Sequence, residues 1–389
     1  MRATPDFDFQ LGESAEMIRE SVGRFADEQI APLAEKIDRE DWFPKDALWA
    51  QMGELGLHGI TVDEADGGLG LGYLEHVIAV EEVSRASASL GLSYGAHSNL
   101  CVNQIRRWGN EEQKAKYLGR LTEAPRIAAY AVTEPGAGSD VASIQTTAVK
   151  DGDDYILNGS KMWITGAGKA DWFFVLAYTD KDAGYKGMSA FIVDAASDGL
   201  SLGKKETNMG QRASDTRSIN FEDVRVPEAN LVGGVEGKGW FNAMTAFDLS
   251  RPNVAAHATG ISRAAFEYAL QYADERETFG KKLHQHQAIQ FMLADMKTKI
   301  EASRALTWKS AWQADNGIRN TESAAHAKRF AADTAMEVTT DAVQVFGGYG
   351  YSEEYPVARL MRAAKVMQIY EGSSQVQRMI IGREITKDL

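Results

Sequence analysis

Cysteine is almost missing from this chain of 389 residues, because Cys101 is its single example. One thiol forms neither an intramolecular disulfide framework nor a thiolate metal cluster, and such usage fits a reducing compartment. We therefore expect Cys101 to be a small, buried, apolar side chain.

Long apolar runs and a targeting segment are missing as well. No stretch approaches the roughly 18 uninterrupted apolar residues of a membrane-spanning helix. The N-terminal sequence MRATPDFDFQ has no apolar signal core. We expect an intracellular protein without a membrane partner, in a bacterial cytoplasm or, as a mature chain, in the mitochondrial matrix.

Basic residues are outnumbered, since 42 Lys and Arg stand against 55 Asp and Glu, for a net charge of -13. A field of this sign repels polyanions, so we expect no binding to nucleic acid or to anionic membrane, although a local basic pocket stays compatible with it. With 44% hydrophobic residues, the chain can bury large cores in two or three domains.

The common nucleotide-binding motifs are also absent. Glycine-rich segments occur at 66–72, 136–139 and 347–350. None of them matches the dinucleotide pattern GxGxxG or the P-loop pattern GxxxxGK(S/T). No His-Cys cluster occurs, and the spacing of His284 and His286 points them in different directions on a helix. We predict no metal site. The loop 133–140 stays open as a cofactor-lining loop or an ordinary turn.

Apolar spacing divides the chain into three parts. Helical periodicity runs through residues 13–37, 46–55, 73–84 and 110–121. From Arg126 short alternating runs follow, and the dipeptides Asp151-Gly152 and Asn158-Gly159 predict hairpin turns.

Long helices are predicted for the last part, because no proline occurs between Pro252 and Pro356 and apolar residues recur at helical spacing. This segregated order predicts an α+β multidomain fold. We expect an N-terminal α-helical domain over 1–125, a central β domain over 126–235 and a C-terminal α-helical domain over 236–389.

The segment 369–375 places Glu371 beside a glycine and serines that are suited to cap the following helix. On its own, this pattern is more typical of an exposed carboxylate in a turn between helices than of a catalytic group. Composition and periodicity go no further.

Five stretches in the same order resemble the acyl-CoA dehydrogenase family. They are YAVTEPGAGSD (130–140), KMWIT (161–165), RETFGKKLHQHQAIQ (276–290), QVFGGYGY (344–351) and IYEGSSQVQR (369–378). The resemblance runs from near Phe9 to the C-terminus and implies N-terminal helices, a central β-barrel and a C-terminal four-helix bundle. The stretch 91–100 is similar to isovaleryl-CoA dehydrogenase, whereas the part after Phe247 is similar to the medium-chain enzyme.

The resemblance implies FAD as the cofactor. From the β domain, the residues expected to line it are Tyr130, Val132, Thr133, Gly138, Ser139, Trp163 and Thr165. From a neighbouring subunit, they are Arg276, Thr278, Phe279, Gln287, Gln344 and Gly348. Ser373 and Gln375 complete the expected cofactor set. The family's dimer thus forms part of the active site, and such dimers usually pair into a homotetramer.

Glu371 is similar to the family's catalytic base, which removes an α-proton of the thioester while hydride leaves the β carbon for the flavin. Excluding water raises the pKa of such a carboxylate, and the family's base also offers its backbone N–H to the thioester carbonyl. Isovaleryl-type members carry the base within the stretch that reads 247–252 here. Because Ser250 stands there, Glu371 is the single candidate base.

Expected substrate-binding residues are Leu92, Tyr94, Ser139, Asp248, Ser250, Arg251, Arg319, Tyr370 and Gly372. By the resemblance, Leu92 and Tyr94 form the acyl pocket floor together with Gly95 and Ala96. Asp248 and Arg251 line the path of the CoA. Arg319 is expected near the adenine or as a solvated surface charge.

The expected reaction is conversion of short-to-medium straight-chain acyl-CoA to trans-2-enoyl-CoA in fatty acid β-oxidation, with electrons passed to an electron-transferring flavoprotein. Three alternatives stay open: a branched-chain, isovaleryl-type dehydrogenase, a flavin oxidase that uses oxygen, and a non-catalytic flavin-binding assembly protein.

Overall fold

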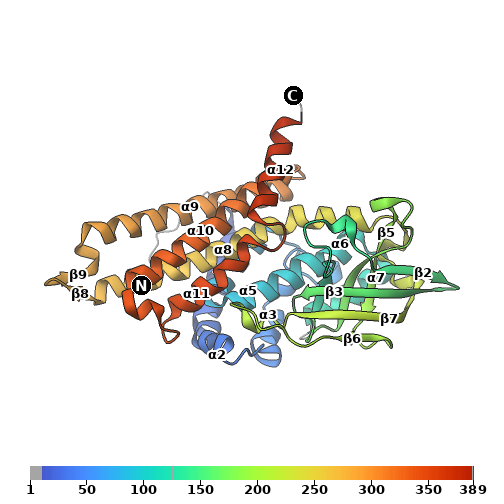
Figure 1. Ribbon diagram of the computed structural model, residues 1–389, viewed down its shortest axis with the longest axis horizontal. Helices are drawn as coiled ribbons and strands as arrows, with labels where there is room; N and C mark the ends of the chain where they lie inside the picture. Colours follow the sequence, from blue (N-terminus) through green and yellow to red (C-terminus); the bar gives the residue numbers. More distant parts are fainter. Residues whose placement is uncertain (1–10, 124–125, 388) are drawn as a thin grey trace.

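The computed structural model describes residues 11–123, 126–387 and 389. Along the longest axis of the molecule, a twisted sheet occupies one end and long helices extend to the other, with a second group of helices packed below them (Figure 1). None of the described helices is both long and apolar enough to cross a membrane. The expected order of helices, sheet and helices is confirmed.

The N-terminal helices surround one buried helix. They are α1 (Glu13–Phe25), α2 (Ala34–Arg39), α3 (Ala50–Glu54), α4 (Tyr73–Ala86), α5 (Ala88–Gly95), α6 (Asn103–Trp108) and α7 (Glu111–Glu123). Most residues of α4 are buried. Two glycines let α5 approach its neighbours: a Cβ on Gly91 would lie 2.2 Å from Ser84 Oγ, and one on Gly95 would lie 2.3 Å from Asn253 Nδ2. The stretch that resembles isovaleryl-CoA dehydrogenase is therefore a helix-packing surface.

The middle of the chain forms a seven-stranded sheet among the described residues. Its strands are β1 (Ala128–Ala131), β2 (Thr147–Asp151), β3 (Asp154–Ile164), β4 (Trp172–Tyr178), β5 (Met188–Asp194), β6 (Leu200–Leu202) and β7 (Arg217–Pro227). Their order is β1-β4-β2-β3-β7-β6, and β5 pairs with β4. Every residue of β4 is buried, because its two faces contribute to two different hydrophobic cores.

One of the two predicted hairpin turns is wrong. Asp151 pairs with Asp154 across the turn that contains Gly152, so the first prediction is confirmed. Gly159, in contrast, lies inside β3, where the register shifts by a bulge between Leu157 and Gly159. A Cβ on Gly159 would lie 2.5 Å from Thr146 Oγ1. This glycine permits close passage of two strands instead of a reversal of the chain.

The C-terminal part is a helical bundle with a small hairpin at its far end. It contains α8 (Gly239–Glu275), β8 (Glu277–Thr278), β9 (Lys281–Lys282), α9 (Gln287–Asp315), α10 (Thr321–Phe346), α11 (Pro356–Ala364) and α12 (Ser374–Thr386). The predicted long helices of the proline-free interval are confirmed, while α12 projects from the body (Figure 1). The domain boundaries after 125 and 235 stay predictions.

Pro252 lies inside α8 and does not end it. Proline lacks the N–H that would bond to the carbonyl four residues earlier, which belongs to Asp248. The Asn320 side chain replaces that donor, with Nδ2 3.0 Å from the Asp248 carbonyl oxygen. The helix therefore stays intact through the segment that carries Ser250 and Arg251.

Buried ion pairs join the N-terminal helices to the bundle. Arg304 Nη2 of α9 lies 2.6 Å from Glu81 Oε1 of α4, and Arg263 Nη1 of α8 lies 2.6 Å from Glu82 Oε1. All four side chains are at most 12% exposed. Because these arginines hold the Glu81 charge, its pKa is lowered to about 2 in spite of burial.

Candidate active site

Glu371 lies in the short turn that enters α12, and its backbone is left-handed. Its φ is +50° and that of Gly372 is +88°. Ser373 then caps α12, because its side chain accepts a hydrogen bond from the Val376 N–H at 3.3 Å. The capping expected from the serines is confirmed, and the turn is a strained one for a residue with a side chain.

The Glu371 carboxylate meets the helix α8. Ser250 Oγ donates a hydrogen bond to Glu371 Oε2, and Ser250 itself is fully buried. Burial raises the pKa of Glu371, while the Ser250 hydroxyl and the cations Lys328 and Arg251 oppose that rise. Ser250, the position where isovaleryl-type members carry the base, thus lies beside Glu371. Of these two positions, only 371 carries a carboxylate in this chain.

Asp248 and Arg251 pair on the same helix, with Arg251 buried and Asp248 half-buried. Arg251 Nη1 lies 2.7 Å from Asp248 Oδ1, and the hydroxyl of Thr321 donates to Asp248 Oδ2 at 2.7 Å. Arg251 Nε is buried and has no hydrogen-bond partner among the described residues. Because an unpaired buried N–H of this kind is costly, Arg251 Nε is suited to donate a hydrogen bond to a ligand oxygen.

Two tyrosines flank Glu371. Tyr370 has its hydroxyl 3.1 Å from His257 Nδ1, and burial next to Glu371 raises the Tyr370 pKa. Tyr130 of β1 stacks on Phe174 with ring centroids 5.0 Å apart. The buried Tyr130 hydroxyl has no partner among the described residues, so the edge of the sheet that faces Glu371 offers an unused polar atom.

The strand ends around Tyr130 fit a planar cofactor. Trp163 is 56% exposed on a left-handed backbone, with φ +62°. Thr133 keeps it close to β1, since the Met162 N–H donates to the Thr133 carbonyl at 2.9 Å. Lys161 is fully buried and donates to the Val132 carbonyl at 3.1 Å. A flavin has an aromatic ring system with polar edges. The exposed Trp163 ring, two threonine positions and the Tyr130 hydroxyl are suited to contact it.

Other expected cofactor residues of the sheet lie nearby in sequence. Val132 is buried, Thr165 is half-buried, and Gly138 and Ser139 are exposed in the loop after β1. A Cβ on Gly138 would meet open space, so this glycine leaves room above the loop.

The residues expected from a neighbouring subunit lie elsewhere. Arg276 ends α8 and places its guanidinium 5.9 Å from the centre of the Tyr349 ring. Thr278 and Phe279 belong to the β8–β9 hairpin, where Phe279 is 97% exposed, and Gln287 begins α9. Gln344 and Gly348 are exposed at the end of α10. Figure 1 shows this hairpin and the sheet at opposite ends of the molecule, so one chain does not unite the two groups.

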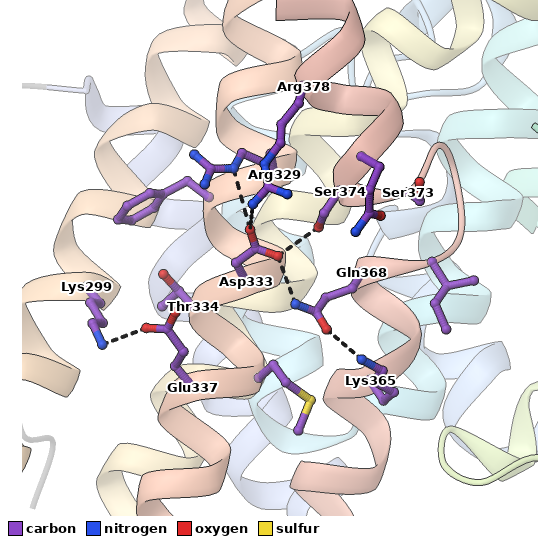
Figure 2. Close-up of a pocket in the computed structure, with 14 residues that line it drawn as sticks. Lys299, Arg329, Asp333, Thr334, Glu337, Lys365, Gln368, Ser373, Ser374 and Arg378 are labelled. Carbon is purple, nitrogen blue, oxygen red and sulfur yellow. Dashed lines mark hydrogen bonds and ion pairs between the residues drawn. The ribbon is translucent and has the colours of Figure 1, made fainter.

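A cavity of about 590 Å³ opens between α9, α10 and the start of α12. Ser373 and Gln375 line it, as do several charged residues that sequence reasoning missed. Asp333 lies at its centre (Figure 2) and accepts hydrogen bonds from Ser374 Oγ and Gln368 Nε2, both at 2.8 Å. Arg329 and Arg378 pair with the same carboxylate. The negative charge of Asp333 therefore partly neutralises the two arginines in the cavity.

The remaining expected substrate residues take different positions. Leu92 is half-buried on α5. Tyr94 is fully buried and donates its hydroxyl to the Leu57 carbonyl at 2.9 Å, so it lies within the N-terminal core. Arg319 is exposed and forms a two-bond pair with Glu384 of α12. Gly372 has its carbonyl bonded to Lys328. Their roles as ligand contacts stay predictions.

A helical, a sheet and a second helical part around a buried carboxylate are the architecture of flavin-dependent dehydrogenases of acyl thioesters. The chain belongs to the acyl-CoA dehydrogenase family. Models of the family's N-terminal, middle and C-terminal domains match residues 12–124, 129–224 and 237–386. The chain is therefore an FAD-dependent oxidoreductase of acyl-CoA, and the family, fold and cofactor that we expected are confirmed.

Curated relatives span nearly the whole chain. It is 45% identical over 378 residues to a short-chain specific acyl-CoA dehydrogenase of Clostridium acetobutylicum, which covers 97% of this chain and 99% of the relative. It is 46% identical over 377 residues to a mitochondrial isovaleryl-CoA dehydrogenase of Solanum tuberosum, with 97% and 91% covered.

Solved structures agree with this placement. Butyryl-CoA dehydrogenase from Megasphaera elsdenii superposes with a TM-score of 0.94 at 43% identity, covering 97% of this chain and all of the other. A chain solved in work on the electron transferring flavoprotein of Acidaminococcus fermentans superposes with a TM-score of 0.96 at 46% identity, covering 98% of this chain and 100% of that chain.

Proposed function

We propose that this chain converts short-to-medium straight-chain acyl-CoA to trans-2-enoyl-CoA, with Glu371 as the base. The observation that carries this proposal is the contact between the Glu371 carboxylate and Ser250. It places the only carboxylate of the two alternative base positions in a buried site where its pKa is raised. A carboxylate with a raised pKa is a stronger base toward the weakly acidic α-proton of a thioester.

In this proposal, different residues of the chain remove the α-proton, orient the thioester and bind the CoA moiety. Glu371 takes the α-proton on its carboxylate, and its backbone N–H together with the left-handed turn orients the thioester carbonyl. Arg251 and Asp248 bind the CoA moiety, supported by the partnerless Arg251 Nε. FAD, when bound, would supply the acceptor for the hydride that leaves the β carbon. Tyr130 and Trp163 would help to hold its flavin.

The cofactor site is completed by a second copy of the chain. Trp163 and Tyr130 of the sheet supply one part, and the exposed Phe279 in the β8–β9 hairpin of a partner supplies the other. The sheet and this hairpin lie at opposite ends of one chain (Figure 1). The cavity between α9, α10 and the start of α12, which Ser373 lines, receives a further part of FAD. Its positive side chains, such as Arg329 and Arg378, support this assignment because they suit the phosphates of a dinucleotide. The assembly is a homotetramer made of two such dimers, as is typical of the family.

A short straight chain is the proposed substrate class. The relative from Clostridium acetobutylicum is short-chain specific, and the similar Megasphaera elsdenii structure is a butyryl-CoA dehydrogenase. The absence of a carboxylate at Ser250, where isovaleryl-type members carry the base, also favours this class over the branched-chain alternative. Similarity to the chain solved with the Acidaminococcus fermentans work supports an electron-transferring flavoprotein as acceptor. The reducing bacterial cytoplasm fits the single buried cysteine.

The test is anaerobic titration of the FAD-loaded protein with butyryl-, octanoyl- and isovaleryl-CoA, while flavin absorbance is followed. We expect rapid bleaching by butyryl-CoA and slower bleaching by isovaleryl-CoA. The Glu371→Gln variant should bind FAD and thioester but bleach at least about 10³-fold more slowly, because an amide removes no proton. Ser262→Ala, a change on α8 away from the carboxylate, is the matched control.

Each alternative predicts its own result. Faster bleaching by isovaleryl-CoA assigns a branched-chain enzyme. In a parallel assay with air present, oxygen consumption at the rate seen with an artificial acceptor assigns an oxidase. Full bleaching by Glu371→Gln shows that the base lies elsewhere. Bound FAD that no thioester bleaches leaves only a flavin-binding protein.

A further inference from the structure

Two backbone carbonyls directly at the proposed base are held by buried side chains. Gln377 Nε2 donates to the Glu371 carbonyl at 3.3 Å and to the Gly372 carbonyl at 2.9 Å. Lys328 Nζ donates to the same Gly372 carbonyl at 2.6 Å. Residues 371 and 372 both have positive φ, so these bonds secure a turn that the backbone of a non-glycine residue disfavours.

Lys328 is an unusual residue for such a position. It lies on α10, is 0% exposed, and donates its hydrogen bond to a backbone carbonyl. A buried ammonium is costly unless nearby groups stabilise its charge. Burial lowers the pKa of Lys328 to about 8, and the negative charges of Glu371 and Asp333 oppose that shift. The cation and the proposed base therefore stabilise each other across the turn.

Position 372 has no room for a side chain. A Cβ at this position would lie 2.5 Å from Gln377 Nε2. The turn is thus closed from one side by Gln377, which is fully buried, and from the other by Lys328.

We infer that Lys328 is a positioning residue for α-proton removal: through the Gly372 carbonyl it fixes the turn that aims the Glu371 carboxylate and N–H. The inference rests on the proposed role of Glu371. Lys328 acts through the turn and contacts the Gly372 backbone. Gln377 is its neutral counterpart, because it holds the same carbonyl without adding charge.

Several charged or titratable groups face Glu371 besides Lys328. Arg251 approaches from α8 with its partner Asp248, and the Ser250 hydroxyl bonds directly to the carboxylate. Tyr130 from β1 and the adjacent Tyr370 are phenols whose pKa values are raised, so they stay neutral near pH 7. Lys328 and Arg251 are therefore the cations that lower the Glu371 pKa against the effect of burial.

The experiment compares Lys328→Met and Gln377→Leu with the control Lys297→Met, which removes a lysine from a half-exposed ion pair of α9. The rate of flavin bleaching by butyryl-CoA is measured anaerobically at several pH values, after bound FAD and the thermal midpoint have been checked. We expect Lys328→Met to bleach about 10²-fold more slowly, because small displacements of a catalytic group cost rates of this order. The KM for butyryl-CoA should change by less than about threefold, since binding groups stay in place.

The pH dependence separates positioning from a general loss of packing. With one cation removed, the Glu371 pKa rises, and the acid limb of the Lys328→Met profile should move to higher pH. Gln377→Leu should bleach about tenfold more slowly with an unmoved acid limb, because it changes geometry without changing charge. Lys297→Met should match the wild type in both measurements.

Two results overturn the inference. One is Lys328→Met with bound FAD, a bleaching rate within about threefold of wild type and an unmoved acid limb. If Lys328→Met does not fold, Gln377→Leu decides instead. A bleaching rate of Gln377→Leu within about twofold of wild type would then overturn the inference. If wild type itself is not bleached by any thioester, the proposed function fails instead. If only Lys328 proves dispensable, the loss of activity in Glu371→Gln still stands.

Discussion

At the residue scale, the Ser250 hydroxyl tunes the strength of the Glu371 carboxylate. It donates a charge-assisted hydrogen bond, which stabilises the ionised form and lowers the pKa that burial has raised. A base must be ionised before it can take a proton. Activity should therefore fall as pH decreases through the raised pKa of Glu371.

Ser250→Ala should shift this acid limb upward. Without the hydroxyl donor the Glu371 pKa rises further, because the ionised carboxylate loses a hydrogen bond that stabilises it. The profile of log kcat/KM against pH measures the shift. Ser262→Ala on the same helix removes a hydroxyl that bonds to the Ala258 carbonyl, and it should leave the limb in place. An unmoved limb in Ser250→Ala would mean that the contact does not persist in the working enzyme.

Sequence reasoning reached Glu371 but not the residues that hold it. Glu371 was visible through its resemblance to a family motif, while its local pattern was more typical of an exposed turn. Lys328 stands in the run AAHAKRFAAD, where a lysine reads as a solvated charge. Only the packing of α10 against the turn shows that it faces inward. A single helix does not reveal which of its polar residues a distant loop will need.

At the scale of elements, the buried charges between α4, α8 and α9 decide how the first helices attach to the bundle. Glu81 receives Arg304, and Glu82 receives Arg263. Removal of one partner leaves a buried charge without compensation, which is costlier than losing the whole pair.

Glu81→Gln should lower stability by about 3 kcal/mol for this reason. The apparent midpoint of thermal unfolding, followed by circular dichroism at fixed protein concentration, records the loss. Lys36→Ala breaks the exposed pair with Glu40, whose atoms are 3.9 Å apart, and should change the midpoint little. Equal midpoints for Glu81→Gln and the wild type would show that water reaches this network.

A second element-scale feature is the histidine group in the N-terminal core. His58 and His76 are fully buried, and burial lowers the pKa of each from 6.5 to about 4. In the unfolded chain they bind protons below about pH 6.5, whereas the folded state resists this until about pH 4. Folding stability should therefore be complete above pH 6.5 and decline as pH falls from 6.5 to 4.

The decline should amount to on the order of 3 kcal/mol for each histidine by the lower end of that window. Urea unfolding of wild type and His76→Gln at several pH values tests it, because the variant should have a shallower slope. His326→Gln, which alters a half-exposed residue paired with Glu322, keeps the wild-type slope. A His76→Gln slope as steep as wild type would contradict the argument.

Periodicity predicted most of the strands and helices, and the wrong turn has a cause outside its own segment. Asn158-Gly159 has the sequence of a hairpin turn, yet the strand continues because the missing Cβ lets it pass Thr146. Pro252 likewise lies inside α8, where Asn320 bonds to the carbonyl that proline leaves free. In both cases a partner distant in sequence decides the local conformation, and periodicity carries no information about it.

At the scale of the whole molecule, the expected cofactor residues lie in two groups that one chain does not unite. Trp163 belongs to the sheet, and Arg276 ends α8 beside the hairpin at the opposite end (Figure 1). If a partner supplies the second group, each active site combines Glu371 of one copy with Arg276 of another.

This arrangement predicts complementation between two inactive variants. Arg276→Ala should lose FAD and Glu371→Gln should lose proton removal, so each homo-oligomer is inactive. In a mixed dimer, one site receives both substitutions and the other receives neither. Co-expression of differently tagged chains, followed by purification of the mixed species, should therefore restore about half of the wild-type activity per dimer. Activity near zero in the mixed species would place both residues in one chain's site.

The left-handed backbone of Glu371 also has a consequence for how this protein changes over evolutionary time. A glutamate at φ +50° costs on the order of 1 kcal/mol relative to glycine, so glycine at this position would relieve backbone strain. The proposed role of Glu371 as the base gives a reason for glutamate to be kept there in spite of that strain. In a lineage released from selection for turnover, a change to glycine would also leave the buried cations Lys328 and Arg251 without the carboxylate, so we expect those cations to change with it.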